Sequence, residues 1–84
     1  GTILTGADLS GGSELVSTNF TNANLTNADL RDAFLVDANL SNAILTGADL
    51  TNAVLTGAIL TGANLENAVL TNAILNCVGH PICV

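Results

Sequence analysis

The most reactive side chains of the chain lie near its C-terminal end, where Cys77, His80 and Cys83 form the pattern Cys-x-x-His-x-x-Cys. A disulfide between the two cysteines would close a short loop and contribute roughly 2 kcal/mol through loop entropy. Alternatively, the thiols stay free and buried. In a third arrangement the three side chains bind a metal, although a structural zinc site takes four ligands and the chain has no further Cys or His. We favour the disulfide, because an even number of cysteines at the end of a fold is typical of a covalent staple.

The expected disulfide also bears on the compartment in which the protein resides. Disulfides persist in oxidising compartments and are rare in the cytosol. We therefore expect an extracytoplasmic location, either a periplasm or a thylakoid lumen. A cytoplasmic location is the alternative.

No group of residues in the sequence resembles a catalytic constellation. His80 has no serine or carboxylate near it in sequence and precedes Pro81, so we interpret it as a loop residue rather than as a general base. The sequence contains no nucleophile elbow, no phosphate-binding loop and no pair of carboxylates in contrasting surroundings. We therefore predict that the protein is not an enzyme and that it has no catalytic, cofactor-binding or metal-binding residues.

The rest of the chain is a repeat of five residues. A Leu, or once a Phe, occupies every fifth position from 15 to 75, an Ala lies two residues before each centre from 23 to 73, and Asn, Asp or Gly lies two residues after each centre from 22 to 72. Two more centres, Leu4 and Leu9, are out of phase by one residue. Successive centres on a helix would lie about 140° apart, and in a flat strand an odd period would alternate between the two faces. The chain must therefore turn within each repeat.

The repeat assigns a position to each residue type. Asn, Asp and Gly tolerate the positive φ of tight turns, so they are expected at the corners. Ala and the centre, two residues apart, are expected to point inward together. The predicted core stack consists of Phe20, Leu25, Leu30, Leu35, Leu40, Leu45, Leu50, Leu55, Leu60, Leu65, Leu70 and Leu75.

Segments such as Ala23–Asn27 and Ala48–Asn52 resemble the pentapeptide-repeat family, whose pattern is Ala, then Asp or Asn, then Leu, then two freer residues. The resemblance covers residues 2–77 or so and implies an all-β solenoid, a right-handed quadrilateral β-helix with four repeats in each coil. It further implies that residues 20 apart stack and that 1–76 form about four coils roughly 18 Å long. Residues 77–84, where the repeat no longer continues, are expected to form a capping segment. The extra residue near Gly11-Gly12 is interpreted as a bulged corner.

The composition narrows the classes of partner. Seven acidic residues against one basic residue, Arg31, give a net charge of -6, and aromatic residues make up only 2% of the chain. Nucleic-acid binders generally need a basic patch and stacking aromatics, so binding to nucleic acid is not expected. No long apolar run is present, because Thr, Asn or Gly recurs in every five residues, so we expect no membrane span.

Both ends of a solenoid need covering. At the C-terminal end the repeat stops after Leu75, and we expect Val78, Ile82 and Val84 to plug the core. At the N-terminal end the repeat is already running at Ile3-Leu4 and no Met precedes Gly1. We expect either that residues have been removed there or that this end packs on another molecule.

One face of the predicted solenoid carries an unusual set of outward residues. On the face with centres Leu15, Leu35, Leu55 and Leu75, apolar residues replace the usual Asp or Asn three times. These replacements and their neighbours form a predicted contact patch consisting of Val16, Phe34, Val36, Val54 and Ile74. Tolerance of single surface apolar residues is the simpler interpretation for Ile44, Ile59 and Val69, which fall singly on other faces. On the adjacent face, Asp8, Asp29 and Asp49 stack beside Arg31, which we interpret as a solvated face rather than a site.

Three functions are compatible with such a surface. We favour a structural or interaction module that binds a protein partner through a flat face, and a second copy of the chain is one candidate partner. The resemblance also implies an alternative, because some family members mimic duplex DNA and bind topoisomerases. This chain looks short for that role. The third is a hydroxyl array that binds an ordered lattice such as ice, built from Thr21, Ser41 and Thr61 together with Thr26 and Thr46.

Overall fold

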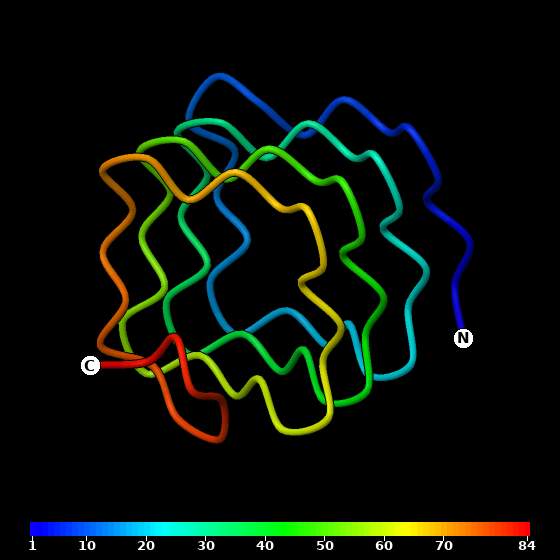
Figure 1. Cartoon of the computed structure of the whole chain (residues 1–84). Helices are drawn as coiled ribbons and strands as arrows, with labels where there is room; N and C mark the ends of the chain where they lie inside the picture. Colours follow the sequence, from blue (N-terminus) through cyan, green and yellow to red (C-terminus); the bar gives the residue numbers. More distant parts are fainter.

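The backbone of the chain pairs with itself at a spacing of 20 residues. The computed structural model describes all 84 residues, Gly1–Val84, and contains no helix and no strand longer than a single bridge residue. The bridges are parallel, and from Glu14–Phe34 to Val54–Ile74 they join residues 20 apart. The chain therefore winds through successive four-cornered loops, and its termini lie at opposite ends of the stack (Figure 1). This arrangement confirms the stacking of residues 20 apart that the resemblance to pentapeptide repeats implies.

The bridges form four columns, each of which defines one face of the stack. We name these faces the Asn24 face, the Asp29 face, the Phe34 face and the Asn39 face. The column of the Asn24 face consists of Ile3, Asn24, Ile44 and Asn64, and that of the Asp29 face consists of Asp8, Asp29, Asp49 and Val69. The column of the Phe34 face consists of Glu14, Phe34, Val54 and Ile74, and that of the Asn39 face consists of Asn19, Asn39, Ile59 and Val78.

Repeats that have a following coil use their backbone groups in the same way. The N–H of a centre donates to the next coil, as Leu25 does to the carbonyl of Ile44 at 2.7 Å, and the corner residue Asn27 donates to Thr46 at 2.8 Å. Within the repeat, the Ala28 N–H donates to the Leu25 carbonyl at 3.0 Å and closes a four-residue turn. The bonds between coils make up most of the 50 backbone hydrogen bonds, so the coils are held together by bonds between chain segments that are distant in sequence.

The corner residues have the backbone conformation that the sequence predicts. All eleven corner residues at every fifth position from 22 to 72 have positive φ, from 58° at Asn27 to 72° at Gly57. A positive φ only at the second central residue is the signature of a type II turn, which requires Gly or Asn there in most proteins. Ser17 adopts the same conformation, with φ of 57°. The sequence alone did not mark it as a corner, because serine rarely occupies this region.

The shift in repeat phase is absorbed at one corner. Asp8 bridges Asp29, 21 residues away, whereas Glu14 bridges Phe34, 20 residues away. The additional residue lies between them, where Gly11 and Gly12 have φ values of 76° and 82°. This confirms the bulged corner, and the four columns continue without a change of face.

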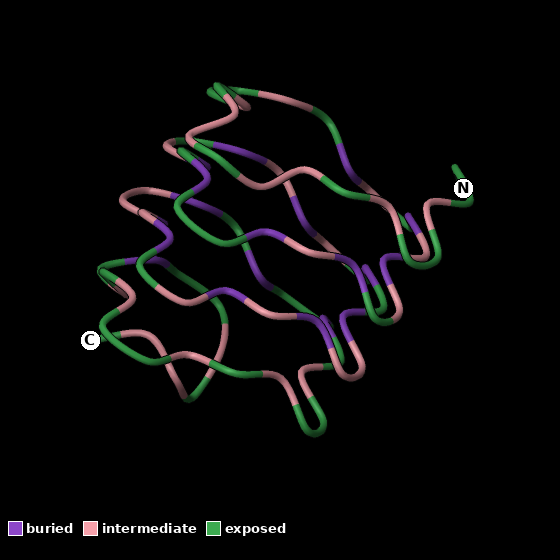
Figure 2. Cartoon of the chain, turned by 90° about the horizontal axis from the view of Figure 1, so that it is seen from above, coloured by how far each residue is buried: buried purple, intermediate pink, exposed green.

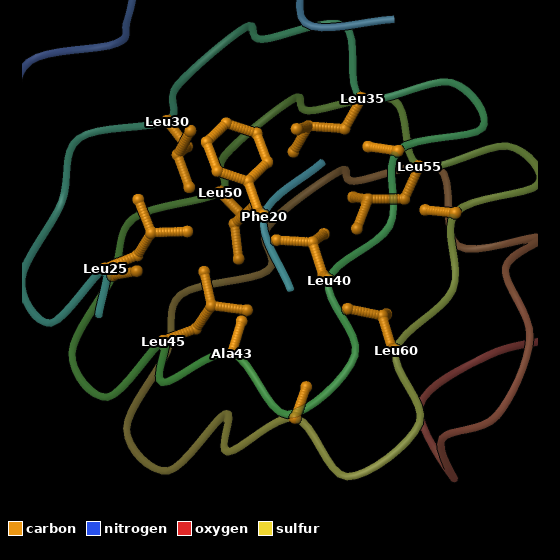
Figure 3. Packing of buried hydrophobic residues seen from close by; sticks show 14 of the residues in the cluster. Phe20, Leu25, Leu30, Leu35, Leu40, Ala43, Leu45, Leu50, Leu55 and Leu60 are labelled. Carbon is orange, nitrogen blue, oxygen red and sulfur yellow. The ribbon is translucent and has the colours of Figure 1, made fainter. Parts of the chain in front are cut away.

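The interior is filled by the centres and the alanines beside them. Phe20 and every leucine centre from Leu25 to Leu60 are buried, as are the alanines from Ala23 to Ala63. Figure 3 shows the labelled leucines and Phe20 pointing from different sides into one common interior. Leu65, Leu70 and Leu75 also belong to the predicted stack but are only partly buried, because no complete coil covers them. Figure 2 accordingly shows buried segments concentrated in the middle coils.

The C-terminal segment differs from the expected plug. Val78 continues the Asn39 face by bridging Ile59, 19 residues away, and its side chain is 53% exposed. Val84 is 91% exposed and contributes its backbone instead, because its N–H donates to the Leu75 carbonyl at 2.8 Å. The expectation that both valines plug the core is therefore wrong. Of the three residues, only Ile82 packs against the core, in company with Cys83.

The difference in burial along the stack predicts a difference in mutational cost. Leu50→Ala should lower the free energy of unfolding by about 2–5 kcal/mol, because its side chain is fully buried and the cavity cannot collapse well. Leu70→Ala, on the same face but in the partly buried last coil, should cost clearly less. Urea unfolding followed by circular dichroism measures both variants. Equal losses would contradict the packing described here.

Candidate interaction surface

The outward residues on each face carry a second layer of hydrogen bonding. In repeats that have a coil on both sides, the N–H of the residue after the centre is the one backbone donor that takes no part in the coil-to-coil or turn bonds. In many repeats the Asn or Asp before the centre satisfies it. The Asn24 Oδ1 accepts the Thr26 N–H at 3.1 Å and the Thr26 hydroxyl at 2.6 Å. We call this arrangement a side-chain cap, and it gives the Asp or Asn of the repeat a structural role.

Seven repeats have this cap, and they are unevenly distributed over the faces. The capped donor lies on the Asp29 face in three repeats, on the Asn24 face in two and on the Asn39 face in two. The pairs are Asp8–Ser10, Asp29–Arg31, Asp49–Thr51, Asn24–Thr26, Asn64–Glu66, Asn19–Thr21 and Asn39–Ser41. On the Phe34 face no repeat is capped.

The Asp29 face behaves as a satisfied polar face. Arg31 donates to both oxygens of Asp29, at 2.8 Å and 2.6 Å, and this pair is the one salt bridge of the chain. The Arg31 guanidinium lowers the pKa of the Asp29 carboxyl, and the hydroxyls of Ser10 and Thr51 lower the pKa values of Asp8 and Asp49. These carboxylates all accept hydrogen bonds within the face, which agrees with its interpretation as a solvated surface.

The Phe34 face combines apolar side chains with free backbone donors. Phe34 and Ile74 are 43% and 50% exposed, and Val16 is exposed beside them. Val36 and Val54 are half-buried and connect these residues into one patch along the whole face. The N–H groups that follow the four centres of this face find no acceptor within the chain, and they belong to Val16, Val36, Thr56 and Asn76. We keep the name contact patch for Val16, Phe34, Val36, Val54 and Ile74.

Apolar residues on the other faces are more scattered, with one correction to the expected pattern. Ile44 lies between Asn24 and Asn64 in its column, and Val69 follows Asp49, so both are single. Ile59 is not single, because it bridges the exposed Val78. The sequence could not place this pair, since the register changes from 20 to 19 residues at the C-terminal end.

The charges surround one end of the contact patch. Six of the seven carboxylates lie on the Asp29 and Phe34 faces or at their corners, and Glu66 is the exception. Glu14, Asp32 and Asp37 border the half of the Phe34 face that contains Phe34. The half with Val54 and Ile74 has no charged residue in its column or at its corners. The Phe34 face therefore has an acidic half and an uncharged half.

The cysteines and the histidine at the C-terminal end are occupied by local structure. Cys77 and Cys83 form a disulfide with a Cα–Cα distance of 5.0 Å. Cys77 lies in the place that Ala has in other repeats and is buried. The Nδ1 of His80 accepts the Ile82 N–H at 3.2 Å. The disulfide alternative is therefore the one that the structure contains, and no three His, Cys, Asp or Glu side chains are grouped to hold a metal ion.

Two of the five hydroxyls proposed as a lattice-binding array are engaged in hydrogen bonds, those of Thr26 and Ser41. Each donates to the preceding Asn at 2.6 Å, and the Thr51 hydroxyl, outside the array, does the same to Asp49. The other three hydroxyls, of Thr21, Thr46 and Thr61, make no such bond. The hydroxyls therefore do not form a uniform set of free donors.

Two further features of the surface complete its description. The molecule has no pocket, so each face is flat at the scale of a small ligand. A helix long and apolar enough to cross a bilayer is not found in the chain.

The sequence of this chain, with its Ala–x–Leu repeat, matches the model of a known protein family. A family model described as pentapeptide repeats matches residues 18–57 and 48–78, with eight copies. The chain belongs to the pentapeptide-repeat family. Proteins of this family are generally structural or interaction modules. A search of curated proteins finds no match.

Three solved structures of similar proteins come from cyanobacteria. The pentapeptide-repeat protein alr5209 from Nostoc PCC 7120 is 35% identical, with a TM-score of 0.51 over 89% of this chain and 68% of its own. Rfr23 from Cyanothece 51142 is 39% identical, with a TM-score of 0.48 over 93% and 64% of the two chains. HetL from Nostoc sp. strain PCC 7120, a protein involved in heterocyst differentiation regulation, is 33% identical, with a TM-score of 0.45 over 92% and 38%. The pentapeptide-repeat chain described here is thus shorter than each of these relatives.

Sequence reasoning identified the apolar column but missed its hydrogen-bonding consequence. The relevant pattern is the type of residue before each centre, because Asn or Asp there caps the donor two residues later and an apolar residue does not. Applied to the sequence, this rule would have marked the Phe34 face as the one without any cap. The pentapeptide repeat thus encodes both shape and surface donors.

The disulfide predicts a local effect on stability. Reduction, or the double variant Cys77→Ala/Cys83→Ser, should lower the free energy of unfolding by about 2 kcal/mol, because the unfolded chain is no longer constrained by the closed loop. Hydrogen exchange should increase in residues 65–78 before the coils from Phe20 to Leu60 are affected, because the staple lies at one end. Mass spectrometry with and without reductant should show a two-proton difference in the native protein. Uniform loss of protection, or stoichiometric zinc in that protein, would contradict this account.

The capped carboxylates predict a dependence of stability on pH. The pKa values of Asp8 and Asp49 are lowered in the folded protein, so their stabilising effect is present above their unfolded pKa and is lost as the pH falls through the folded value. Urea midpoints should therefore be steady near neutral pH and decline below about pH 4. The double variant Asp8→Asn/Asp49→Asn keeps both acceptors without titrating, so its decline should be smaller. An identical decline would show that these caps do not carry the effect.

Proposed function

We propose that this chain, a right-handed β-helix of about four coils, is a non-enzymatic module that binds a protein partner through the Phe34 face. The observation that carries the proposal is the coincidence of the contact patch with the complete lack of side-chain caps on that face. Covering exposed apolar side chains with a partner stabilises the complex by roughly 25 cal/mol for each Å² of apolar surface removed from water. A partner with hydrogen-bond acceptors would also satisfy the free N–H groups.

The other faces support the choice by contrast. The Asp29 face satisfies three of its four corresponding donors and neutralises one carboxylate with Arg31. Burying such groups under a partner would exchange existing hydrogen bonds for new ones with little net gain. No structural observation favours the topoisomerase-binding alternative, so we do not carry it forward.

We propose an extracytoplasmic location for the protein, in a periplasm or thylakoid lumen. The disulfide between Cys77 and Cys83 supports this location, because such bonds persist in oxidising compartments.

The proposed function is tested with two matched valine variants. Val54→Asp places a charge in the contact patch, and Val69→Asp places the same charge at the equivalent position of the Asp29 face. Both new carboxylates lie where Asp49 lies in its repeat and could cap Thr56 or Thr71, so both variants should fold with urea midpoints no lower than the wild type. Affinity capture from the native compartment should recover partners with the wild type and Val69→Asp, and lose them with Val54→Asp. If Val54→Asp retains every partner, the Phe34 face is not the binding surface.

A further inference from the structure

We propose that the partner of the Phe34 face is the same face of a second copy, with the two stacks antiparallel. The proposal rests on the proposed function and names its partner. It starts from the polarity of the face, since Glu14, Asp32 and Asp37 border one half and the half with Val54 and Ile74 is uncharged. Such a surface is complementary to itself when it is turned end over end.

Two symmetric ways of pairing the faces exist, and charge distinguishes them. An isologous pair has its two-fold axis in the interface, either along the stacks or across them. With the axis along the stacks, Asp32 of one copy would lie near Asp37 of the other, twice, and all six carboxylates would gather in one half. Like charges placed together at an interface oppose binding. With the axis across the stacks, each acidic half lies opposite an uncharged half.

The antiparallel arrangement also matches apolar groups at the centre of the interface. The first coil of one copy faces the last coil of the other, so Glu14 lies opposite Ile74 and Phe34 lies opposite Val54. The Phe34–Val54 contact occurs twice around the two-fold axis. The most apolar part of the contact patch is therefore at the centre of the interface, and the carboxylates are at its rim, as in other protein interfaces.

The same arrangement offers acceptors to the free donors. Val36 lies opposite Thr56, whose Oγ1 already donates to Asn76 Oδ1 at 2.8 Å and keeps lone pairs free to accept the Val36 N–H of the second copy. The Glu14 carboxylate lies beside the end of the second copy that carries the free Asn76 N–H. Two of the four uncapped donors on each copy thus gain partners, and the outer ones remain within reach of water.

The size of the face predicts a weak dimer. One face is about one sixth of the accessible surface of 4076 Å², or about 700 Å² in each copy, which lies near the lower end of stable interfaces. Each copy also has a net charge of -6, so the two repel at long range. Added salt screens this repulsion. Salt should therefore strengthen self-association, whereas it would weaken the binding of a basic partner.

Sedimentation equilibrium of the full chain tests the association. The wild type should form dimers at high micromolar to millimolar concentration, with a dissociation constant that falls as NaCl is raised from about 0.05 to 0.5 M. Val54→Asp should weaken the dimer by about tenfold or more, and Val69→Asp by less than about twofold. A wild type that is monomeric at 1 mM in high salt would overturn the proposal, as would equal weakening by both variants. The capture experiment with Val54→Asp would then still decide whether the face binds another protein.

Disulfide cross-linking tests the orientation. A mixture of Glu14→Cys and Ile74→Cys proteins should form the mixed dimer under mild oxidation, because these positions face each other across the antiparallel interface. Neither variant alone should cross-link, since its two cysteines would be three coils apart, roughly 14 Å, and disulfides need Cα atoms within about 7 Å. Predominant cross-linking of Glu14→Cys with itself would overturn the antiparallel arrangement.

Discussion

Closure of the coil every 20 residues depends on a backbone conformation that few residues adopt easily. Each corner needs positive φ at one position, and the chain supplies Asn, Asp or Gly there with the single exception of Ser17. Once the corners are fixed, the leucine and alanine of every repeat point inward and the backbone groups meet those of the next coil. The core is therefore a consequence of the turns as much as of hydrophobicity, because the same leucines on a helix would form no common stripe.

The corners also determine what the surface must do. Closing the turn leaves one N–H per repeat pointing outward, and the residue before the centre decides whether a side chain or the solvent accepts it. Fold and surface character are thus linked at a single position of the repeat. An Asp such as Asp49 stabilises its own coil, whereas a Val such as Val54 leaves a donor free and adds apolar area, which suits a surface that is covered by another molecule.

The regular part of this structure could be predicted because each local choice is repeated. The period, the corner residues and the bulge at Gly11-Gly12 all follow from residue types at fixed spacing. The C-terminal end could not be predicted in the same way, since the register changes there by one residue and moves Val78 outward. The side-chain caps were also missed, because they depend on where an N–H points after the turn has formed.

The bulged corner shows where the molecule tolerates a change in chain length. Gly11 and Gly12 accommodate an added residue while the columns on either side keep their faces, and no atom lies within 4 Å of where a Cβ would project from either residue. The neighbouring coil bonds, such as that from Leu15 to Phe34, are formed as they are elsewhere. This corner is therefore a natural position for grafting a foreign peptide, which would extend into solvent from a rigid scaffold and leave the opposite end of the stack undisturbed.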